Sequence, residues 1–225
     1  MKRELNPKML YFGTPIVLIS SLNDDGSTNI APMSSAWWVG RTAMLGLSVN
    51  SQTVRNLQRR PRLVLNLVDS SMVDAVDRLA LLTGRPDVPE YKRARGYTYQ
   101  PDKYRAAGLT PTVLDAGSPT AVAESLIQME GQVRAIHDID EDDSGLRALE
   151  VKVLHTHVDE SLLMTGHPDY IDPVRWQPLI MKFTEYFAGG ELARPSSLAK
   201  GWGMPQPQPG PAAAIAVGAT AARGS

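Results

Sequence analysis

The residues around position 51 have the types and the spacing of an anion-binding helix start. Ser51 is a good N-cap and Pro61 ends the segment, so residues 51–60 are predicted to form a short helix. The first backbone N–H groups of a helix have no partner within it, and the helix dipole favours negative charge at that end. The start of this helix could therefore hold a phosphate.

The neighbouring side chains add to this chemistry. The hydroxyl of Thr53 and the amide of Asn56 would face the same anion. Cations follow at Arg55, Arg59 and Arg60. The alternative is that Ser51 caps an ordinary surface helix and that the arginines lie on a solvated face, since Ser-x-Thr before a helix is common.

The predicted helix sits within an ordered set of strands. A strand, an acidic turn with Gly26 and a second strand ending in Ala-Pro-x-Ser precede it, and an apolar run interrupted by one amide follows it. These strands are expected at residues 16–21, 29–32, 44–49 and 63–68. Strand ends and a helix start are thus expected to meet at one edge of a mainly β fold.

This constellation resembles the flavin reductase-like, FMN-binding split-barrel family, in its flavoredoxin-type branch. The two stretches nearest the expected site are residues 31–37 and 50–56. Other similar segments lie at residues 104–110, 121–125, 129–133, 151–159 and 170–179. The likeness covers roughly residues 5–190.

The resemblance implies the architecture. We expect a mainly β fold, a six-stranded antiparallel split β-barrel of Greek-key type with peripheral α-helices. The split-barrel domain is expected over residues 1–200, followed by a tail rich in Pro, Gly and Ala over residues 201–225. We also expect a homodimer, because flavins of this family sit in a groove that the second subunit completes.

The resemblance also implies which residues hold the cofactor. Backbone N–H groups and hydroxyls at the end of the second strand would serve O4 and N5 of the flavin, and the helix start would hold its phosphate. Asn50 and β-strand residues would line the ribityl and pyrimidine side. The complete expected set is Ser34, Ser35, Ala36, Trp37, Asn50, Ser51, Thr53, Asn56, Asn66 and Leu67.

The implied activity is that of an FMN-dependent oxidoreductase, with FAD as a possible cofactor. The simplest form is an NAD(P)H:flavin reductase that supplies reduced flavin or electrons to a partner oxygenase. Hydride transfer between nicotinamide and flavin depends on positioning and stacking, so no catalytic acid or base is assigned. The alternatives are a flavoenzyme acting directly on a small organic substrate and a flavin or electron carrier without turnover.

One departure from the family pattern concerns the nicotinamide donor. Shorter flavin reductases of this superfamily carry a His in a turn before the late strand, whereas residues 142–147 contain none. A flavin site is therefore better supported than NAD(P)H as the donor. Trp37 and Trp38 could wall the flavin or stack a substrate, or could simply pack.

Several other polar groups invite competing interpretations. His155 and His157 share one face of a strand and, with His167, could suggest zinc, but no cysteine or clear further ligand accompanies them, so no metal site is predicted. The acidic residues 138–143 lack the positions of a calcium loop and indicate a solvated hairpin turn. Polar residues that could meet substrate or be structural are Glu124, Glu130 and His137.

Composition limits the classes of function. The chain has 225 residues, 43% of them hydrophobic, which suits one sizeable core. A formal net charge of −1 gives no electrostatic reason to expect nucleic acid or an anionic membrane as partner. There is no cysteine, so redox chemistry must depend on a bound cofactor. No leader-like or membrane-spanning apolar run is seen, and we expect a cytoplasmic protein.

The remaining stretches are less regular. Residues 72–82 are predicted to form a helix, and residues 126–135 and 149–154 to form strands. Residues 83–119 hold several prolines and tyrosines and are expected to be a long connection with one helix, a length that is typical of functional loops.

Overall fold

The computed structural model describes residues 1–7, 10–139 and 145–205. The chain divides into two compact units. The larger unit consists of Met1–Val158 and Pro178–Ala188, and the smaller unit of Asp159–Gln177 and Gly189–Ser225. Most of the predicted tail, and the part of the predicted acidic turn from residue 140 to residue 143, lie outside the described residues.

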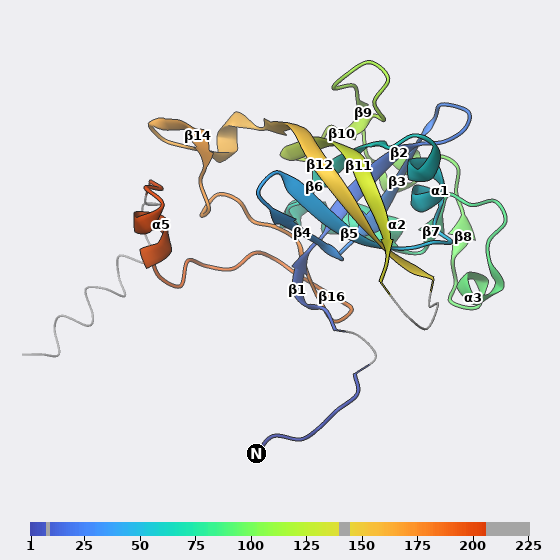
Figure 1. Ribbon diagram of the computed structural model, residues 1–225, viewed down its shortest axis with the longest axis horizontal. Coiled ribbons are helices and arrows are strands. Elements are labelled where there is room, and N and C mark those ends of the chain that lie inside the picture. Colours follow the sequence, from blue (N-terminus) through green and yellow to red (C-terminus); the bar gives the residue numbers. More distant parts are fainter. Residues whose placement is uncertain (8–9, 140–144, 206–225) are drawn as a thin grey trace, which may run out of the picture. The chain divides into compact units, whose positions relative to one another are not determined.

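The larger unit is built on an antiparallel sheet of seven strands in the order β3-β2-β6-β11-β12-β5-β4 (Figure 1). These strands are β2 (Val17–Leu22), β3 (Thr28–Met33), β4 (Ala36–Val39), β5 (Thr42–Ser48), β6 (Arg62–Leu67), β11 (Ile127–Asp138) and β12 (Leu146–Val158). The mainly β, antiparallel prediction is confirmed. The expected strand number differs by one, and β4 is the short strand at one edge.

The connection between β3 and β4 dictates how this sheet curves. The two strands are the opposite edges of the sheet, yet only Ser34 and Ser35 separate them in sequence. In a flat sheet the edges of seven strands would be about 29 Å apart, while the chain from Met33 to Ala36 reaches about 11 Å. The sheet must therefore curl until its edges approach each other at Ser34 and Ser35, which is the seam of a split barrel.

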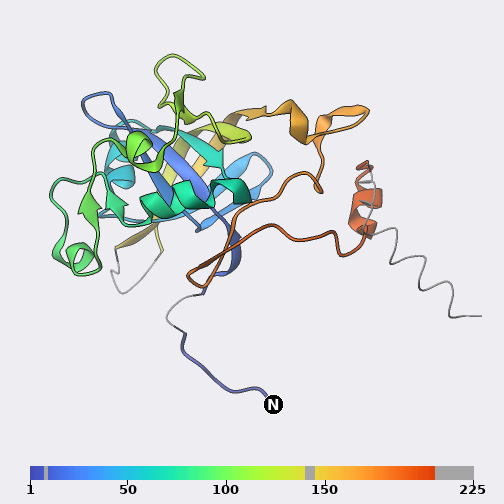
Figure 2. The same ribbon diagram turned by 180° about the vertical axis from the view of Figure 1, so that it is seen from behind.

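The sheet has a core on each face. Inside the curl, alternate strand residues such as Val17, Ile19 and Leu65 pack together with Val54 and Leu57 of α1 (Gln52–Arg59). On the other face, apolar side chains pack beneath α2 (Val73–Ala80) and α4 (Lys103–Ala107), which Figure 2 shows lying across the sheet. Because both faces are covered, the central strands read as continuous apolar runs.

The connection between β6 and β11 contains more regular structure than predicted. Residues 83–119 include two helices where one was expected. The elements from residue 70 to residue 122 not yet given are η1 (Ser70–Met72), β7 (Leu82–Thr83), α3 (Glu90–Arg93), β8 (Thr98–Tyr99), β9 (Pro111–Thr112) and β10 (Ala121–Val122). The helix predicted at residues 72–82 is confirmed as η1 and α2 with slightly different bounds.

A smaller sheet joins the two ends of the larger unit. Strand β1 (Phe12–Pro15) pairs with β15 (Ile180–Lys182), which pairs with β16 (Glu185–Phe187). The smaller unit contains η2 (Glu160–Leu162), the hairpin of β13 (Leu163–Met164) and β14 (His167–Ile171), and α5 (Ser197–Gly201). Within the parts of the chain that the structure describes, no helix combines the length and apolar composition needed to cross a bilayer.

A buried lysine secures the free edge of β3. The Lys103 side chain is 3% exposed and its Nζ donates a hydrogen bond of 3.0 Å to the carbonyl of Ile30. Burial, with a smaller contribution from Lys92, lowers the pKa of Lys103 from 10.5 to about 8. This bond fixes the strand that runs into the seam.

We predict that Lys103 makes the folded protein more stable as the pH rises from about 8 to 10.5. In this window the unfolded chain binds the lysine proton and the folded chain does not, so the free energy of unfolding should increase by up to about 3 kcal/mol. Urea unfolding across this range should show the increase in the wild type and in the exposed control Lys152→Met, but not in Lys103→Met. An unchanged pH dependence in Lys103→Met would contradict the assignment.

Candidate functional site

At the seam of the barrel, β5 packs closely against the link between β3 and β4. The Ser35 carbonyl accepts a 2.8 Å hydrogen bond from the N–H of Gly46 on β5, and its Oγ lies 3.2 Å from the hydroxyl of Tyr11. A Cβ at Gly46 would stand 2.9 Å from the Cβ of Ser35, so this approach requires glycine. Ser34 is buried.

Strand β4 presents different side chains to the two faces of the sheet. Ala36 is buried, and Trp38 packs against the inner core, where its Nε1 has no hydrogen-bond partner among the described residues. Trp37 points the other way and is 57% exposed. The exposed indole beside Ser35 is therefore available to stack on a flat ligand.

Helix α1 begins as predicted. Ser51 is its N-cap, and the Ser51 Oγ accepts a 3.1 Å hydrogen bond from the N–H of Val54. The N–H groups of Gln52 and Thr53 occupy the first helical positions, where a helix offers no carbonyl partner. The exposed residue Asn50 precedes them. The predicted donors for an anion are thus present as backbone groups.

The side chains of Thr53 and Asn56 have a different place from the one predicted. Thr53 is 1% exposed and accepts a 3.4 Å hydrogen bond from Asn29 Nδ2, and Asn56 is 2% exposed. The Asn56 amide donates to Ser21 Oγ and Asn23 Oδ1. Both residues therefore anchor the first turns of α1 to β2, β3 and the turn between these strands.

Gly84 and Arg85 lie at the same helix start, although sequence reasoning did not select them. A Cβ at Gly84 would stand 2.4 Å from Asn29 Oδ1, which is buried and has no partner within the described part of the chain. The Arg85 guanidinium donates to the carbonyl of Asn50 at 3.1 Å and to Asp87. The sequence signal that could have pointed to them is the Gly84-Arg85 pair, which closely follows the helix predicted at residues 72–82.

The charged side chains at the start of α1 favour the binding of an anion. The Arg85 side chain is 15% exposed, and Arg55 Nη1 lies 3.6 Å from an Asp87 carboxylate oxygen. The hydrogen bond that Arg85 donates to Asp87 raises the pKa of Arg85 and lowers the pKa of Asp87. Two guanidinium groups thus face one carboxylate beside the positive end of α1, which leaves an excess positive charge for a phosphate.

Asn66 and Leu67 lie apart from the helix start. Asn66 is fully buried, and its amide donates to the Leu18 carbonyl at 2.9 Å and accepts from the Val122 N–H at 2.8 Å. These bonds attach β10 to the sheet and explain the single amide in the apolar run. Leu67 is half-buried and packs against the inner core. The structure shows no open face of Asn66 for a ligand.

Strand β5 links the seam to the helix start. Gly46 contacts Ser35, and Ser51 follows Gly46 by five residues. An extended chain rises about 3.3 Å per residue, so the two places are at most about 17 Å apart. A ligand that carries a flat ring at one end and a phosphate at the other end of a short chain could reach both.

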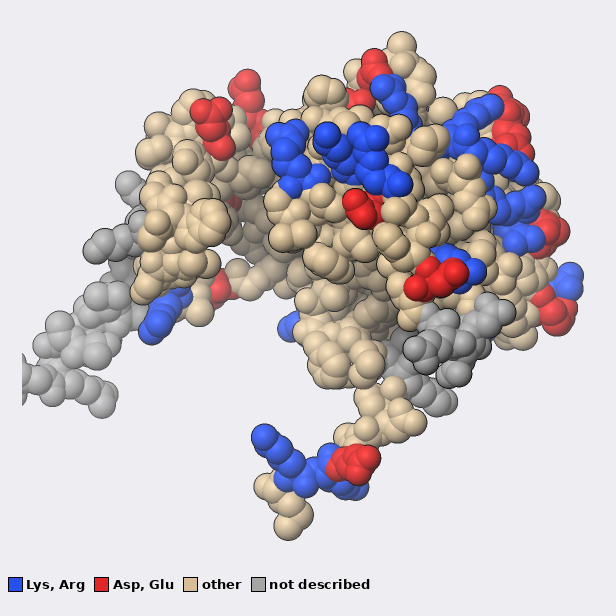
Figure 3. Space-filling model, in the orientation of Figure 1, with Lys and Arg blue, Asp and Glu red and all other residues tan. Residues whose placement is uncertain are grey.

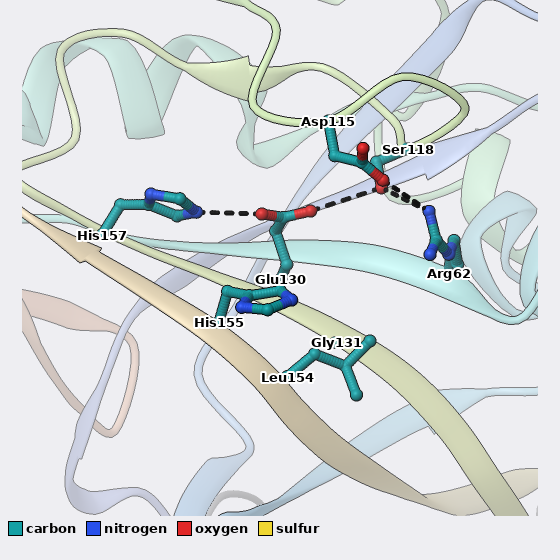
Figure 4. A pocket seen from close by; sticks show the side chains of 8 residues that line it. All are labelled: Arg62, Asp115, Ser118, Glu130, Gly131, Leu154, His155 and His157. Atoms are coloured by element: carbon teal, nitrogen blue, oxygen red, sulfur yellow. Dashed lines mark hydrogen bonds and ion pairs between the residues drawn. The ribbon is translucent and has the colours of Figure 1, made fainter.

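A second polar cluster lies on the sheet elsewhere (Figure 4). The buried Glu130 carboxylate lies 2.9 Å from His157 Nε2 and accepts from Ser118 Oγ, while Arg62 donates to Asp115 at 2.7 Å. The cavity beside them has a volume of about 330 Å³. Since its acidic groups already have partners, the cluster serves to fasten residues 115–118 to β6 and β11.

The remaining polar candidates have protein partners. Glu124 accepts from the N–H of Thr110, and His137 lies 3.6 Å from Glu150. Across residues 1–7, 10–139 and 145–205, no group of three or more His, Asp and Glu side chains is arranged to hold a metal ion.

Comparison with protein families gives the identity of the fold. A family model described as a flavin reductase like domain matches residues 9–188. The chain belongs to the flavin reductase-like family. A relative from Bacillus subtilis (strain 168), the uncharacterized protein YdfE, is 38% identical over 188 residues, which cover 84% of this chain and 89% of YdfE.

Solved structures of low sequence identity share the same fold. Flavoredoxin of Desulfovibrio vulgaris (Miyazaki F) superposes with a TM-score of 0.71 at 21% identity, covering 89% of this chain and all of the other. Nitrilotriacetate monooxygenase component B from Bacillus cereus gives 0.67 at 20% identity, covering 86% and 98%. These structures show the split-barrel fold, and membership of the flavin reductase-like family makes the chain a flavin-dependent oxidoreductase.

We predict that Ser51→Ala lowers the free energy of unfolding of this flavin reductase-like protein by about 1 kcal/mol, because α1 loses its N-cap bond. Gln58→Ala, an exposed change on the same helix, should alter stability by less than about 0.5 kcal/mol. Chemical denaturation measures both. Equal stability of Ser51→Ala and the wild type would exclude the capping role.

Proposed function

We propose that this protein is an NAD(P)H-dependent flavin reductase that binds FMN and supplies reduced flavin or electrons to a partner oxygenase. The observation that carries the proposal is the start of α1, where free backbone N–H groups and Arg85 lie within one strand length of the seam. Such a start is a ready-made phosphate site.

The proposed positions of the cofactor follow from this arrangement. The N–H groups of Gln52 and Thr53, with Ser51 and Arg85, would hold the phosphate. At the seam, Ser34, Ser35, Ala36 and Trp37 would hold the ring edge and its face. Asn50 and Leu67 are proposed for the ribityl and pyrimidine side, while Asn66 and the Asn56 amide support the site from beneath.

The hydrogen-bond donors at the start of α1 and at the seam fit FMN. The bound flavin supplies the ring that accepts and passes on hydride. The protein's residues then need only orient the ring and exclude water, since charge-assisted bonds at the phosphate fix one end and backbone groups at the seam fix the other. Gly46 lets β5 approach the seam closely, because a Cβ there would stand 2.9 Å from the Cβ of Ser35.

The proposed partners of this protein are inferred from its family and from similar structures. One similar structure is named as component B of a monooxygenase, which supports a partner oxygenase as the recipient of reduced flavin. A homodimer is proposed as the state that completes the flavin groove, with the exposed Trp37 near the contact. A cytoplasmic site of action is proposed with NAD(P)H as the donor.

A second candidate function is the direct reduction of a small organic substrate. The observation in its favour is Trp37, whose exposed indole beside the seam could stack an aromatic compound. Anaerobic mixing of the flavin-bound protein with each compound distinguishes the two candidate functions. Rapid bleaching of the bound flavin absorbance by NADH or NADPH supports the reductase, whereas bleaching only by a particular small molecule supports direct reduction. Bleaching by neither would favour a flavin carrier.

We predict that the double change of Ser51→Ala and Arg85→Gln weakens FMN binding by about 2 kcal/mol, a factor of about 30, through lost hydrogen bonds at the phosphate. Riboflavin, which has no phosphate, provides the control and should bind the variant and the wild type equally. Fluorescence titration measures both affinities. If FMN affinity is unchanged, or if riboflavin affinity falls equally, the phosphate is held elsewhere.

A further inference from the structure

The hydroxyl groups of Tyr11 and Ser35 form a pair at the seam. Tyr11 Oη and Ser35 Oγ lie 3.2 Å apart, and either oxygen can be the donor. Both residues are half-buried, and within the described ranges neither hydroxyl has a second partner. A hydroxyl has one proton and two lone pairs, so it can donate to one group while it accepts from another. The pair can therefore reverse its direction without moving its oxygen atoms.

The backbone of Tyr11 is held by the turn between β15 and β16. Phe183 begins this turn with a φ of 56°, a conformation that bulky non-glycine residues rarely adopt. Its N–H donates to the Tyr11 carbonyl at 2.6 Å, and its ring packs edge-on against Phe12 with 5.3 Å between the centroids. A costly backbone conformation persists only where surrounding contacts fix it, and such positions cluster at functional sites. The strained turn thus positions Tyr11 beside the seam.

Ser35 is fixed independently of Tyr11. Its carbonyl accepts the hydrogen bond from the N–H of Gly46, which ties the link between β3 and β4 to β5. The surface near the pair carries little charge, because Figure 3 shows mostly uncharged side chains where β1 and β16 lie in Figure 1. Two separately fixed hydroxyls with few charged competitors suit the recognition of a neutral ring edge.

We propose that Tyr11 is a positioning residue that lets Ser35 bind the N5 edge of the flavin in both of its redox states. The inference rests on the proposed function, in which the seam holds this edge. N5 is an acceptor in the oxidised ring and carries a hydrogen in the reduced ring. Toward oxidised flavin, Tyr11 donates to Ser35 and the Ser35 hydroxyl donates to N5. Toward reduced flavin, Ser35 Oγ accepts from the N5 hydrogen and the Ser35 proton turns to Tyr11 Oη. Each oxygen keeps its own proton throughout.

The test is the relative affinity for reduced and oxidised FMN, measured as the reduction potential of the bound flavin in an anaerobic titration against a reference dye. Tyr11→Phe keeps the ring and the backbone bond but removes the acceptor for the Ser35 proton. Reduced FMN should then bind about fivefold more weakly relative to oxidised FMN, which for a two-electron couple lowers the potential by about 20 mV. Tyr99→Phe, the same change at an exposed tyrosine, is the matched control and should leave the potential unchanged.

A double-mutant cycle tests whether Tyr11 acts through Ser35. In a Ser35→Ala background, Tyr11→Phe should change the potential no further, because the hydroxyl that Tyr11 positions is gone. A decrease that persists in full in this background would overturn the proposal.

The remaining outcomes separate the hydroxyl pair from the proposed function. An unchanged potential in Tyr11→Phe, with equal affinity losses for the two redox states or with none, would overturn the role of Tyr11, while FMN binding by the wild type still supports the flavin reductase. A wild type that binds no flavin would overturn both.

Discussion

The two-residue link between β3 and β4 is the constraint on which the rest of the larger unit depends. Because Ser34 and Ser35 join the two edges of a seven-stranded sheet, the sheet has to curl, and the curl creates both the inner core and the seam. The Gly46 and Ser35 contact and the Lys103 bond to Ile30 then hold the strands on either side of the seam. A ligand at the seam meets backbone that the whole sheet keeps in place.

The start of α1 depends on the same frame. Asn29 on β3 and Asn23 in the turn between β2 and β3 bind Thr53 and Asn56, so the polar side chains beneath the helix fix its direction while its first N–H groups face outward. The positive helix end, Arg55 and Arg85 then concentrate charge at one point. Rigid placement of donors before a ligand arrives lowers the cost of binding, which is how a split barrel with no assigned acid or base can serve a redox cofactor.

Much of the fold and part of the candidate site could be predicted from the sequence, for physical reasons that differ between residues. The apolar runs of β2 and β6 are local signals, as are Ser51 and Pro61 at the two ends of the predicted helix, and these local signals predicted the strands and α1. The roles of Thr53, Asn56 and Asn66 could not be predicted in this way. A buried structural side chain and a ligand-binding side chain can be the same residue type, and only the tertiary contacts distinguish them. Arg85 was missed because its partner, the Asn50 carbonyl, is 35 residues away.

The proposed function requires that α1 holds the phosphate of a flavin whose ring lies at the seam. A crystal structure of the protein with bound FMN tests this most directly. We expect the phosphate oxygens within about 3 Å of the N–H groups of Gln52 and Thr53, and the ring against residues 34–37. A phosphate bound at another place, with the start of α1 facing solvent, would contradict the proposed phosphate site.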